Sequence, residues 1–254
     1  MSGQHHKHPK QILGIDIGGS GIKAAPVDLH SGEFVKDRRR IPTPESGGPE
    51  EIIEIARALC REFDWDGPVG CAFPGVIRKG HTLPAANLNP AWVGINADKL
   101  FSEAIGNPVT MINDADAAGL AEVDLGAAKG VDGVVVMITL GTGIGTAVFV
   151  DGHLVPNTEF GHLRLDGVEA EDLASSRAKN DDEIGFSEWS KRVENYLLEM
   201  ERLFWPDMFV IGGGISKNFE KFGPRIQIDT PVVQAELKNR AGIVGAALAA
   251  SKDR

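Results

Sequence analysis

Three glycine-rich loops, each following an apolar run, carry the residues best suited to chemistry. The first is GIDIGGSGIK (residues 14–23), where one carboxylate, Asp16, precedes the glycines and Lys23 follows them. The second is LGTGIGTA (140–147) and the third is IGGGISK (211–217). Because glycine lets backbone N–H groups approach a ligand closely, such loops are suited to phosphate.

Three interpretations of the first loop compete. It lacks the G-x-x-x-x-G-K-[ST] pattern of a Walker A loop. Residues 19–24 fit the dinucleotide fingerprint G-x-G-x-x-A, but Pro26 and the turn at 30–32 interrupt the helix that this fingerprint needs. The third interpretation is a β-hairpin whose glycine tip binds phosphate, with Asp16 orienting a Mg²⁺ ion or its waters. Simple tight turns explain one such loop well, but matched loops less well.

Asp114 and the pair Glu159 and His162 are the candidate groups for an alcohol substrate. A carboxylate placed to remove a hydroxyl proton typically contributes about 10²–10⁴-fold to a rate. Asp114 ends an apolar strand and opens a helix, so from the residues alone a helix cap is the simpler explanation. A carboxylate beside an imidazole can accept and donate hydrogen bonds to paired hydroxyls, although Glu-x-x-His is more often a surface pair.

The elements that must position these groups alternate between strand and helix. We expect a strand at 12–17, a hairpin formed by 22–29 and 33–40, and a helix at 49–63 with Pro49 in its first turn. The basic run 38–40 is interpreted as a solvated strand end. A second helix follows Asn96 as its cap. The expected helix at 187–204 is suited equally to a core or to a dimer interface.

The strand–glycine loop–hairpin pattern occurs twice, near residues 18 and 141, which indicates two related domains. A small-residue helix predicted at 235–251 is expected to return to the N-terminal domain, which otherwise lacks a covering helix. The predicted division is therefore 1–113 plus 236–254 for the small domain, and 114–235 for the large one.

Composition excludes several classes of function. The chain has 254 residues and a formal net charge of −10, with a pI near 5.2, which disfavours broad binding to nucleic acid or membranes. The stretch MSGQHHKHPK (residues 1–10) has no apolar signal core, and no apolar run is long enough to span a bilayer. The two cysteines, Cys60 and Cys71, form no CxxC pair, so a reduced, cytoplasmic compartment is expected.

Taken in order, the motifs resemble a known superfamily. DIGGSGIK, LGTGIGTA and IGGGISK are similar to the two phosphate motifs and the nucleoside-site motif of the actin–hexokinase–Hsp70 superfamily, while NDADAA and EFGHLRLDG resemble the ROK sugar kinases. The resemblance implies an α/β fold with two RNase H-like domains flanking a cleft. It also implies these phosphate-binding residues: Asp16, Gly18, Gly19, Ser20, Gly21, Lys23, Thr142, Gly143, Gly145, Gly213, Gly214 and Lys217.

The same resemblance assigns a sugar site. Asn113-Asp114 matches the family's Asn-Asp pair, which makes Asp114 the general base in place of a cap. The implied sugar-binding residues are Gly75, Asn87, Asn113, Glu159, His162 and Glu171. Many members follow E-x-G-H with a cysteine-rich zinc loop. This chain has no cysteine after Cys71, so we expect no zinc site of that type.

Within the family, the short chain without a zinc loop resembles the polyphosphate glucokinase branch. The implied reaction transfers the terminal phosphoryl group of inorganic polyphosphate to the 6-hydroxyl of glucose, with Mg²⁺. Many members also accept ATP, some accept mannose, and a homodimer is expected. Because the chain is acidic, polyphosphate would need a local cationic groove, for which the candidates are Lys23, Lys191, Arg192, Lys217, Lys221, Arg225, Lys238 and Arg240.

Three alternatives stay open at this point. An ATP-dependent ROK glucokinase or mannokinase would use the same motifs. A non-catalytic, sugar-sensing ROK protein would carry a helix-turn-helix, and only about a dozen residues precede the first expected strand. An actin-like filament protein would leave the E-x-G-H segment unexplained. The sequence does not decide between polyphosphate and ATP, between glucose and mannose, or between chain lengths of polyphosphate.

Overall fold

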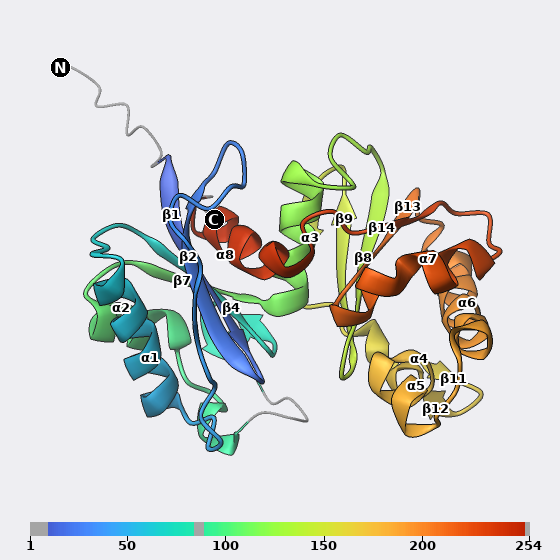
Figure 1. Cartoon of the computed structure of the whole chain (residues 1–254), viewed down its shortest axis with the longest axis horizontal. Helices are drawn as coiled ribbons and strands as arrows, with labels where there is room; N and C mark the ends of the chain where they lie inside the picture. Colours follow the sequence, from blue (N-terminus) through green and yellow to red (C-terminus); the bar gives the residue numbers. More distant parts are fainter. Residues whose placement is uncertain (1–9, 84–88, 252–254) are drawn as a thin grey trace. The chain divides into compact units, whose positions relative to one another are not determined.

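The structure is a computed structural model that describes residues 10–83 and 89–251. The chain divides into two compact units, which we call unit 1 (residues 1–114 and 242–254) and unit 2 (residues 115–241). Each unit contains one five-stranded sheet with helices packed against it (Figure 1). No helix in the described residues has the length and hydropathy needed to cross a bilayer.

The sheet of unit 1 combines an antiparallel hairpin with a parallel half. Its strand order is β3-β2-β1-β4-β7. β1 pairs antiparallel with β2 and parallel with β4, and β4 pairs parallel with β7. The strands are β1 (Gln11–Gly18), β2 (Gly21–Asp28), β3 (Arg39–Ile41), β4 (Val69–Phe73) and β7 (Val109–Asn113), and a separate two-stranded ribbon is formed by β5 (Ile77–Arg78) and β6 (His81–Thr82).

Two helices cover one face of this sheet (Figure 1). α1 (Pro49–Glu62) places its apolar side chains, including Ile52 and Leu59, in the same buried cluster as Leu13 of β1. α2 (Ala97–Ile105) begins after Asn96, whose side chain accepts a hydrogen bond from the Lys99 N–H, as the sequence predicts. The 3-10 helix Pro90–Trp92 adds a fully buried indole to that cluster.

The opposite face is covered by α8 (Ala241–Ser251), the last described helix. Its backbone approaches the sheet at Gly14 and Gly70 so closely that a Cβ at Gly14 would lie 2.0 Å from the Ile243 carbonyl oxygen. The predicted start of this helix, at residue 235, is wrong by six residues. Residues Lys238–Arg240 form a 3-10 turn, and the helix begins where small residues permit the backbone contact.

Unit 2 repeats the strand order of unit 1. Its sheet runs β10-β9-β8-β13-β14, with the β8–β9–β10 part antiparallel and the β8–β13–β14 part parallel. The strands are β8 (Val134–Leu140), β9 (Ile144–Val150), β10 (His153–Val155), β13 (Met208–Gly212) and β14 (Val232–Gln234), with a β11 (Arg164–Leu165) and β12 (Val168–Glu169) hairpin beside them.

The helices of unit 2 are of unequal length. They are α3 (Asp114–Leu125, which begins at the last residue of unit 1), α4 (Ala170–Ala174), α5 (Ser176–Asp181), α6 (Phe186–Phe204) and α7 (Phe219–Phe222), with 3-10 turns at Phe160–His162, Gly214–Asn218 and Gly223–Arg225. The apolar stripe of α6, including Trp189, Tyr196 and Met200, is fully buried within the unit. That stripe is therefore core.

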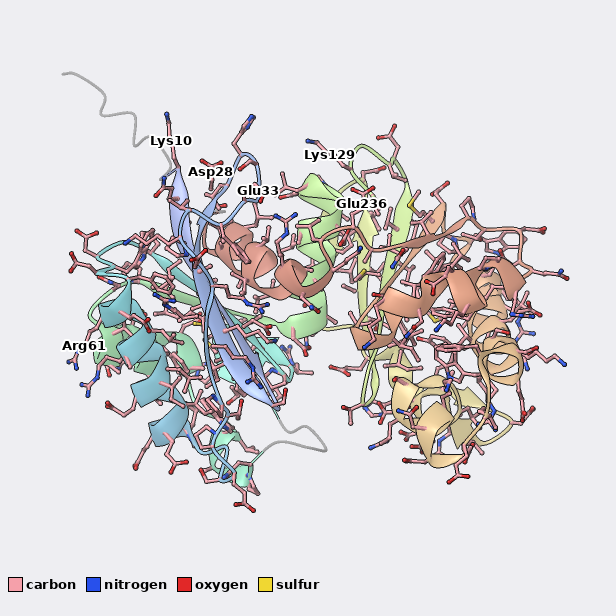
Figure 2. All side chains as sticks on the ribbon, viewed as in Figure 1. Lys10, Asp28, Glu33, Arg61, Lys129 and Glu236 are labelled. Atoms are coloured by element: carbon pink, nitrogen blue, oxygen red, sulfur yellow. The ribbon has the colours of Figure 1, made fainter. Side chains whose placement is uncertain are left out.

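The predicted hairpin strand at 33–40 is largely wrong. Phe34 forms an isolated bridge with Val27, and regular pairing resumes only at Arg39–Ile41. The Asp28 carboxylate accepts hydrogen bonds from the His30 and Ser31 N–H groups and holds the turn before Phe34, and bends at residues 35–36 interrupt the strand after it. Asp28 pairs with Gln11, so this turn lies at the amino end of β1, away from the glycine tip (Figure 2).

The close contact between α8 and the sheet predicts a large effect of Gly70→Ala. A Cβ at this position would lie 1.8 Å from the Ala246 carbonyl oxygen, and backbone atoms cannot turn aside. We expect the free energy of unfolding to fall by about 1–3 kcal/mol, as overpacked cores do. Gly19→Ala is the matched control, because no heavy atom lies within 4 Å of its Cβ position. Equal stability of the two variants by thermal unfolding would contradict the described packing.

Candidate functional site

Parallel pairing brings the predicted residues of unit 1 to one edge of its sheet. Asp16 is in register with Ala72 of β4, and Ala72 is in register with Ile112 of β7. The chain segments that follow these three strands therefore begin at the same edge. Two strand spacings separate β1 from β7, a lateral distance of roughly 9–10 Å. The first glycine loop and Asp114 follow these paired residues in the chain, so both lie beyond the row formed by Asp16, Ala72 and Ile112.

The Asn113-Asp114 pair lies where β7 ends and α3 begins. Asn113 is buried, and its Nδ2 donates a hydrogen bond of 3.2 Å to the Gly75 carbonyl oxygen. This contact joins two of the predicted sugar-binding residues. Asp114 is exposed at the first position of α3, so its carboxylate is accessible to a substrate. Asn87, the third predicted residue of this region, lies outside the described residues.

The first glycine loop is the tip of the β1–β2 hairpin, and this geometry supports the hairpin interpretation. Gly18 pairs directly with Gly21, and the exposed residues Gly19 and Ser20 form the turn. Lys23 donates to Asp16 Oδ2 at 2.8 Å, with the Asp16 side chain 18% exposed. Magnesium bound to substrate phosphates needs only one or two protein carboxylates and keeps several waters. Asp16 fits that requirement, although Lys23 already neutralises one of its oxygens.

Two residues near β3 hold the hairpin tip, and the sequence interpretation missed both. Arg40 Nη2 donates to the Ser20 carbonyl oxygen at 2.7 Å, and Thr43 Oγ1 donates to the Gly18 carbonyl oxygen. Residues 38–40 are exposed and lead into β3, as a solvated strand end requires, but this prediction did not include the contact of Arg40 with the tip. The side chain of Arg40 is exposed but crosses the tip. The contact forms because the short strand β3 pairs with β2 beside the tip. No local pattern in the sequence predicted this pairing.

The second and third glycine loops follow adjacent parallel strands of unit 2. Gly212 of β13 is in register with Thr139 of β8, so both loops begin at the same sheet edge. Gly213 has φ +80°, and a Cβ there would lie 2.4 Å from the Leu140 carbonyl oxygen. This position therefore requires glycine for both its conformation and its space. Thr142, Gly214 and Lys217 are exposed or partly exposed beyond these strand ends.

The predicted sugar-binding side chains of unit 2 gather beside the second loop. Glu171 Oε2 accepts a hydrogen bond of 3.3 Å from the Ile144 N–H. It lies 2.4 Å from the Cβ position of Gly143, so a side chain at Gly143 would require the Glu171 carboxylate to shift. Partial burial raises the pKa of Glu159, with His162 opposing this shift and Glu171 adding to it. The electrostatic coupling shows that these three side chains form one cluster.

Glu169 joins this cluster and was not predicted. His162 Nδ1 lies 2.8 Å from Glu169 Oε2, and this hydrogen bond is the largest cause of the raised pKa of His162. A signal for the contact exists in the sequence. The Asp166-Gly167 turn pairs Arg164 with Glu169 in a tight hairpin, which returns Glu169 to the imidazole.

The same cluster offers metal-ligand atoms. One nitrogen or oxygen atom from each of His162, Glu169 and Glu171 lies within 4.8 Å of the others. The donor types suit a divalent cation, but hydrogen-bonding groups of this kind also suit sugar hydroxyls. The two cysteines, Cys60 and Cys71, are buried in the core of unit 1 and are not part of this cluster.

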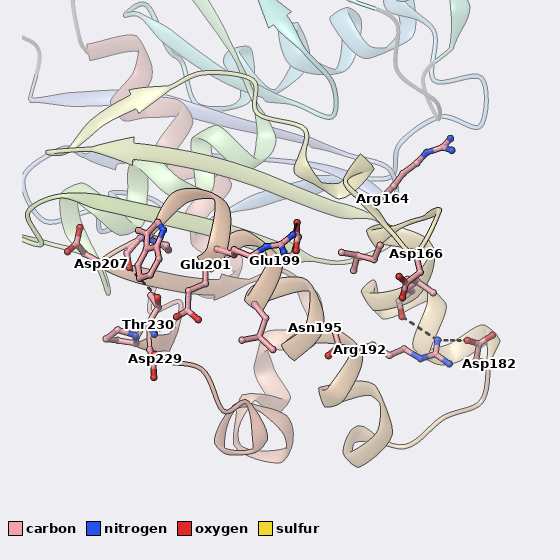
Figure 3. Close-up of a pocket in the computed structure, with 17 residues that line it drawn as sticks. Arg164, Asp166, Asp182, Arg192, Asn195, Glu199, Glu201, Asp207, Asp229 and Thr230 are labelled. Atoms are coloured by element: carbon pink, nitrogen blue, oxygen red, sulfur yellow. Dashed lines mark hydrogen bonds and ion pairs between the residues drawn. The ribbon is translucent and has the colours of Figure 1, made fainter.

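A wide groove of about 1290 Å³ runs along α6, apart from the glycine loops (Figure 3). Its arginines are Arg164, Arg192 and Arg202, and its acidic residues are Asp166, Asp182, Glu199, Glu201, Asp207 and Asp229. Arg192, a predicted polyphosphate contact, is paired with Asp182 at 2.5 Å, as Figure 3 shows. Because acidic groups outnumber cationic ones, this groove is unsuited to a polyanion.

Comparison with known proteins gives a consistent picture. Residues 12–180 match the ROK family. The chain is 46% identical over 242 residues to a polyphosphate glucokinase of Mycobacterium tuberculosis (strain CDC 1551 / Oshkosh), covering 95% of this chain and 91% of that protein. These findings confirm the resemblance on which the sequence interpretation relied.

Two solved structures agree over nearly the whole chain. One is an inorganic polyphosphate/ATP-glucomannokinase from Arthrobacter sp. strain KM, with TM-score 0.90, 45% identity, and coverage of 94% of this chain and 98% of that one. The other is a ROK family glucokinase from Streptomyces griseus in complex with glucose and AMPPNP, with TM-score 0.81, 25% identity, and coverage of 94% and 99%. The predicted α/β, actin/hexokinase-like fold is confirmed.

The contact between His162 and Glu169 predicts a measurable change of pKa. In Glu169→Gln, the pKa of His162 should fall toward the ordinary histidine range, because the largest cause of its increase is removed. In the native chain the protonated pair stabilises the fold below the pKa of an unfolded histidine, and this contribution is lost as pH rises through the raised pKa. Titration of the imidazole C–H signals by NMR measures both values. The control is Glu220→Gln, and equal His162 pKa values in both variants would contradict the assignment.

Proposed function

The chain belongs to the ROK family, and we propose that it transfers the terminal phosphoryl group of inorganic polyphosphate to the 6-hydroxyl of glucose. The product is glucose 6-phosphate, and ATP serves as a second donor. The observation that carries this proposal is the common edge in unit 1, where an exposed Asp114 and the first glycine loop follow strands two positions apart. Near-full-length similarity to polyphosphate glucokinases supports the choice of donor and acceptor.

Asp114 acts as the general base in this proposal. Its carboxylate accepts the proton of the 6-hydroxyl while that oxygen forms a bond to the terminal phosphorus. The bridging P–O bond breaks, and the shortened polyphosphate leaves with the electron pair. Asn113, fixed by its hydrogen bond to Gly75, directly precedes the base in the chain and is proposed to bind the sugar. Phosphoryl transfer depends chiefly on such positioning and on charge neutralisation.

The polar side chains of unit 2 suit glucose hydroxyls, and the glycine loops suit phosphate. Glu159, His162 and Glu171 of unit 2 hold glucose hydroxyls, with the imidazole of His162 donating and the carboxylates accepting. The second and third glycine loops of unit 2 and the first loop of unit 1 bind phosphate oxygens through backbone N–H groups. Mg²⁺, when bound, offsets the negative charge of the donor phosphates, and Asp16 is the residue suited to hold it or its waters.

An ATP-dependent glucokinase or mannokinase is the nearest alternative, since a ROK glucokinase crystallised with AMPPNP shares this fold. Long stretches of similarity to the polyphosphate-dependent relatives favour our choice. We further propose that the two units act as the functional domains, that the protein forms a homodimer, and that it works in the cytoplasm. The two free, buried thiols of Cys60 and Cys71 suit a reducing compartment.

Donor assays test the proposed function directly. We expect purified protein with Mg²⁺ and long-chain polyphosphate as sole donor to form glucose 6-phosphate, measured by coupled reduction of NADP⁺. Parallel reactions with ATP, and with mannose in place of glucose, define the range of substrates. Activity with ATP alone would replace the proposal by the ATP-dependent alternative, and inactivity with every donor would contradict both.

Asp114→Asn tests the base. Because a positioned carboxylate typically contributes about 10²–10⁴-fold, kcat should fall by at least 100-fold, while the Kd for glucose stays within about tenfold. Isothermal titration measures the glucose Kd and the coupled assay measures kcat. Asp66→Asn, an exposed aspartate in the turn after α1, is the control. Retention of most of the turnover by Asp114→Asn would show that another group removes the proton.

A further inference from the structure

Three charged residues form a row across one face of the unit 1 sheet. Asp16 pairs directly with Lys23, and Lys23 pairs directly with Arg40. Residues opposite each other in antiparallel strands project to the same face, so the three side chains are neighbours. The glycine tip formed by Gly18 and Gly21 continues this face by one more pair of positions.

The charges in this row do not cancel. Asp16 and Lys23 form an ion pair of 2.8 Å. Arg40 instead donates to a neutral acceptor, the Ser20 carbonyl oxygen at 2.7 Å, and takes part in no ion pair among the described residues. Several other arginines of the described chain are paired with carboxylates: Arg39 with Glu62, Arg57 with Glu54, Arg177 with Asp172, Arg192 with Asp182 and Arg202 with Glu199. The row therefore keeps one net positive charge, at the phosphate loop.

The space beside Gly21 accommodates the guanidinium of Arg40. A Cβ at Gly21 would lie 2.6 Å from Arg40 Nε and 2.9 Å from Arg40 Cζ and Nη2. The side chain of Arg40 therefore lies flat across the position that a larger residue would fill. The absence of a side chain at Gly21, a buried residue, thus leaves room for a cation beside the turn.

We propose that Arg40 is a donor-binding residue that contacts phosphate oxygens of the phosphoanhydride chain at the first glycine loop. One nitrogen of the guanidinium is used by Ser20, and its other N–H groups remain to donate to phosphate oxygens. The inference rests on the proposed function, in that the donor is polyphosphate or ATP. It assigns to one named side chain a charge that an acidic protein needs for binding a polyanion.

A purely structural role is the competing explanation, since the hydrogen bond to Ser20 also fixes the turn. The two roles differ in their dependence on salt. A cation that binds phosphate makes donor binding weaken as ionic strength rises, because exposed charges are screened over roughly 8–10 Å. A hydrogen bond that only fixes the turn has no such effect on the donor. Stability and salt dependence therefore separate the roles.

Arg40→Gln and Arg40→Lys are compared with Arg39→Gln. Arg39 is the adjacent arginine, pairs with Glu62 at 2.6 Å, and is opposite Ala24 on the other face of the sheet. We expect Arg40→Gln to raise the donor KM about tenfold, the range for hydrogen bonds to charged groups, without a change in glucose KM. It should also flatten the dependence of donor kcat/KM on NaCl. Arg40→Lys keeps the charge and should keep the wild-type slope, and Arg39→Gln should change each value less than twofold.

The same variants are titrated with tripolyphosphate by calorimetry, which needs no turnover, and melted to check folding. Wild-type inactivity with every donor would contradict the proposed function. In active wild type, a donor KM and salt slope of Arg40→Gln equal to those of Arg39→Gln would overturn the inference. So would a lower melting temperature in both Arg40 variants with an unchanged salt slope in each. Should Arg40→Gln fail to fold, loss of the salt slope in Arg40→Lys would overturn it equally.

Discussion

Parallel pairing of β1, β4 and β7 is the constraint on which the site in unit 1 depends. Neighbouring parallel strands run in the same direction, so their carboxyl ends lie at the same edge of the sheet. The connections that follow these strands therefore begin beside one another. The glycine tip, the Pro74-Gly75 turn and the Asn113-Asp114 pair all use this edge. The proposed base and the proposed phosphate loop, which are nearly a hundred residues apart in sequence, thereby begin about two strand spacings apart.

Unit 2 has the same sheet topology as unit 1 but carries different polar side chains at the corresponding edge. Its sheet has the strand order of unit 1, and its two glycine loops again follow parallel neighbours, β8 and β13. The polar groups added to this edge differ. A 3-10 turn, a tight hairpin and the start of α4 supply Glu159, His162, Glu169 and Glu171. The same framework therefore carries glycine loops in both units, which we propose to bind phosphate, while the local insertions of unit 2 carry the polar residues that we propose to bind hydroxyl groups.

Most elements of the fold could be predicted because they depend on local patterns, whereas the candidate site residues were assigned from the family resemblance. Glycine loops after apolar strands, Asn96 as a cap and the apolar stripe of α6 are all visible within short windows. Arg40 could not be assigned, because its contact with Ser20 depends on where β3 rejoins the sheet after an irregular segment. The start of α8 was misjudged, because the strand glycines that receive it are more than 170 residues away. The roles of the site residues stay predictions.

The position of α8 has a consequence for biosynthesis. One face of the unit 1 sheet receives its covering helix from residues that follow all of unit 2. During translation, β1 to β7 emerge long before that helix is synthesised. One apolar face of their sheet therefore stays uncovered while about 130 further residues are added. Unit 2 is continuous and can complete its own core first, which reverses the usual order in which amino-terminal domains fold. A chaperone would therefore be needed while the amino-terminal half has emerged and α8 has not yet been synthesised.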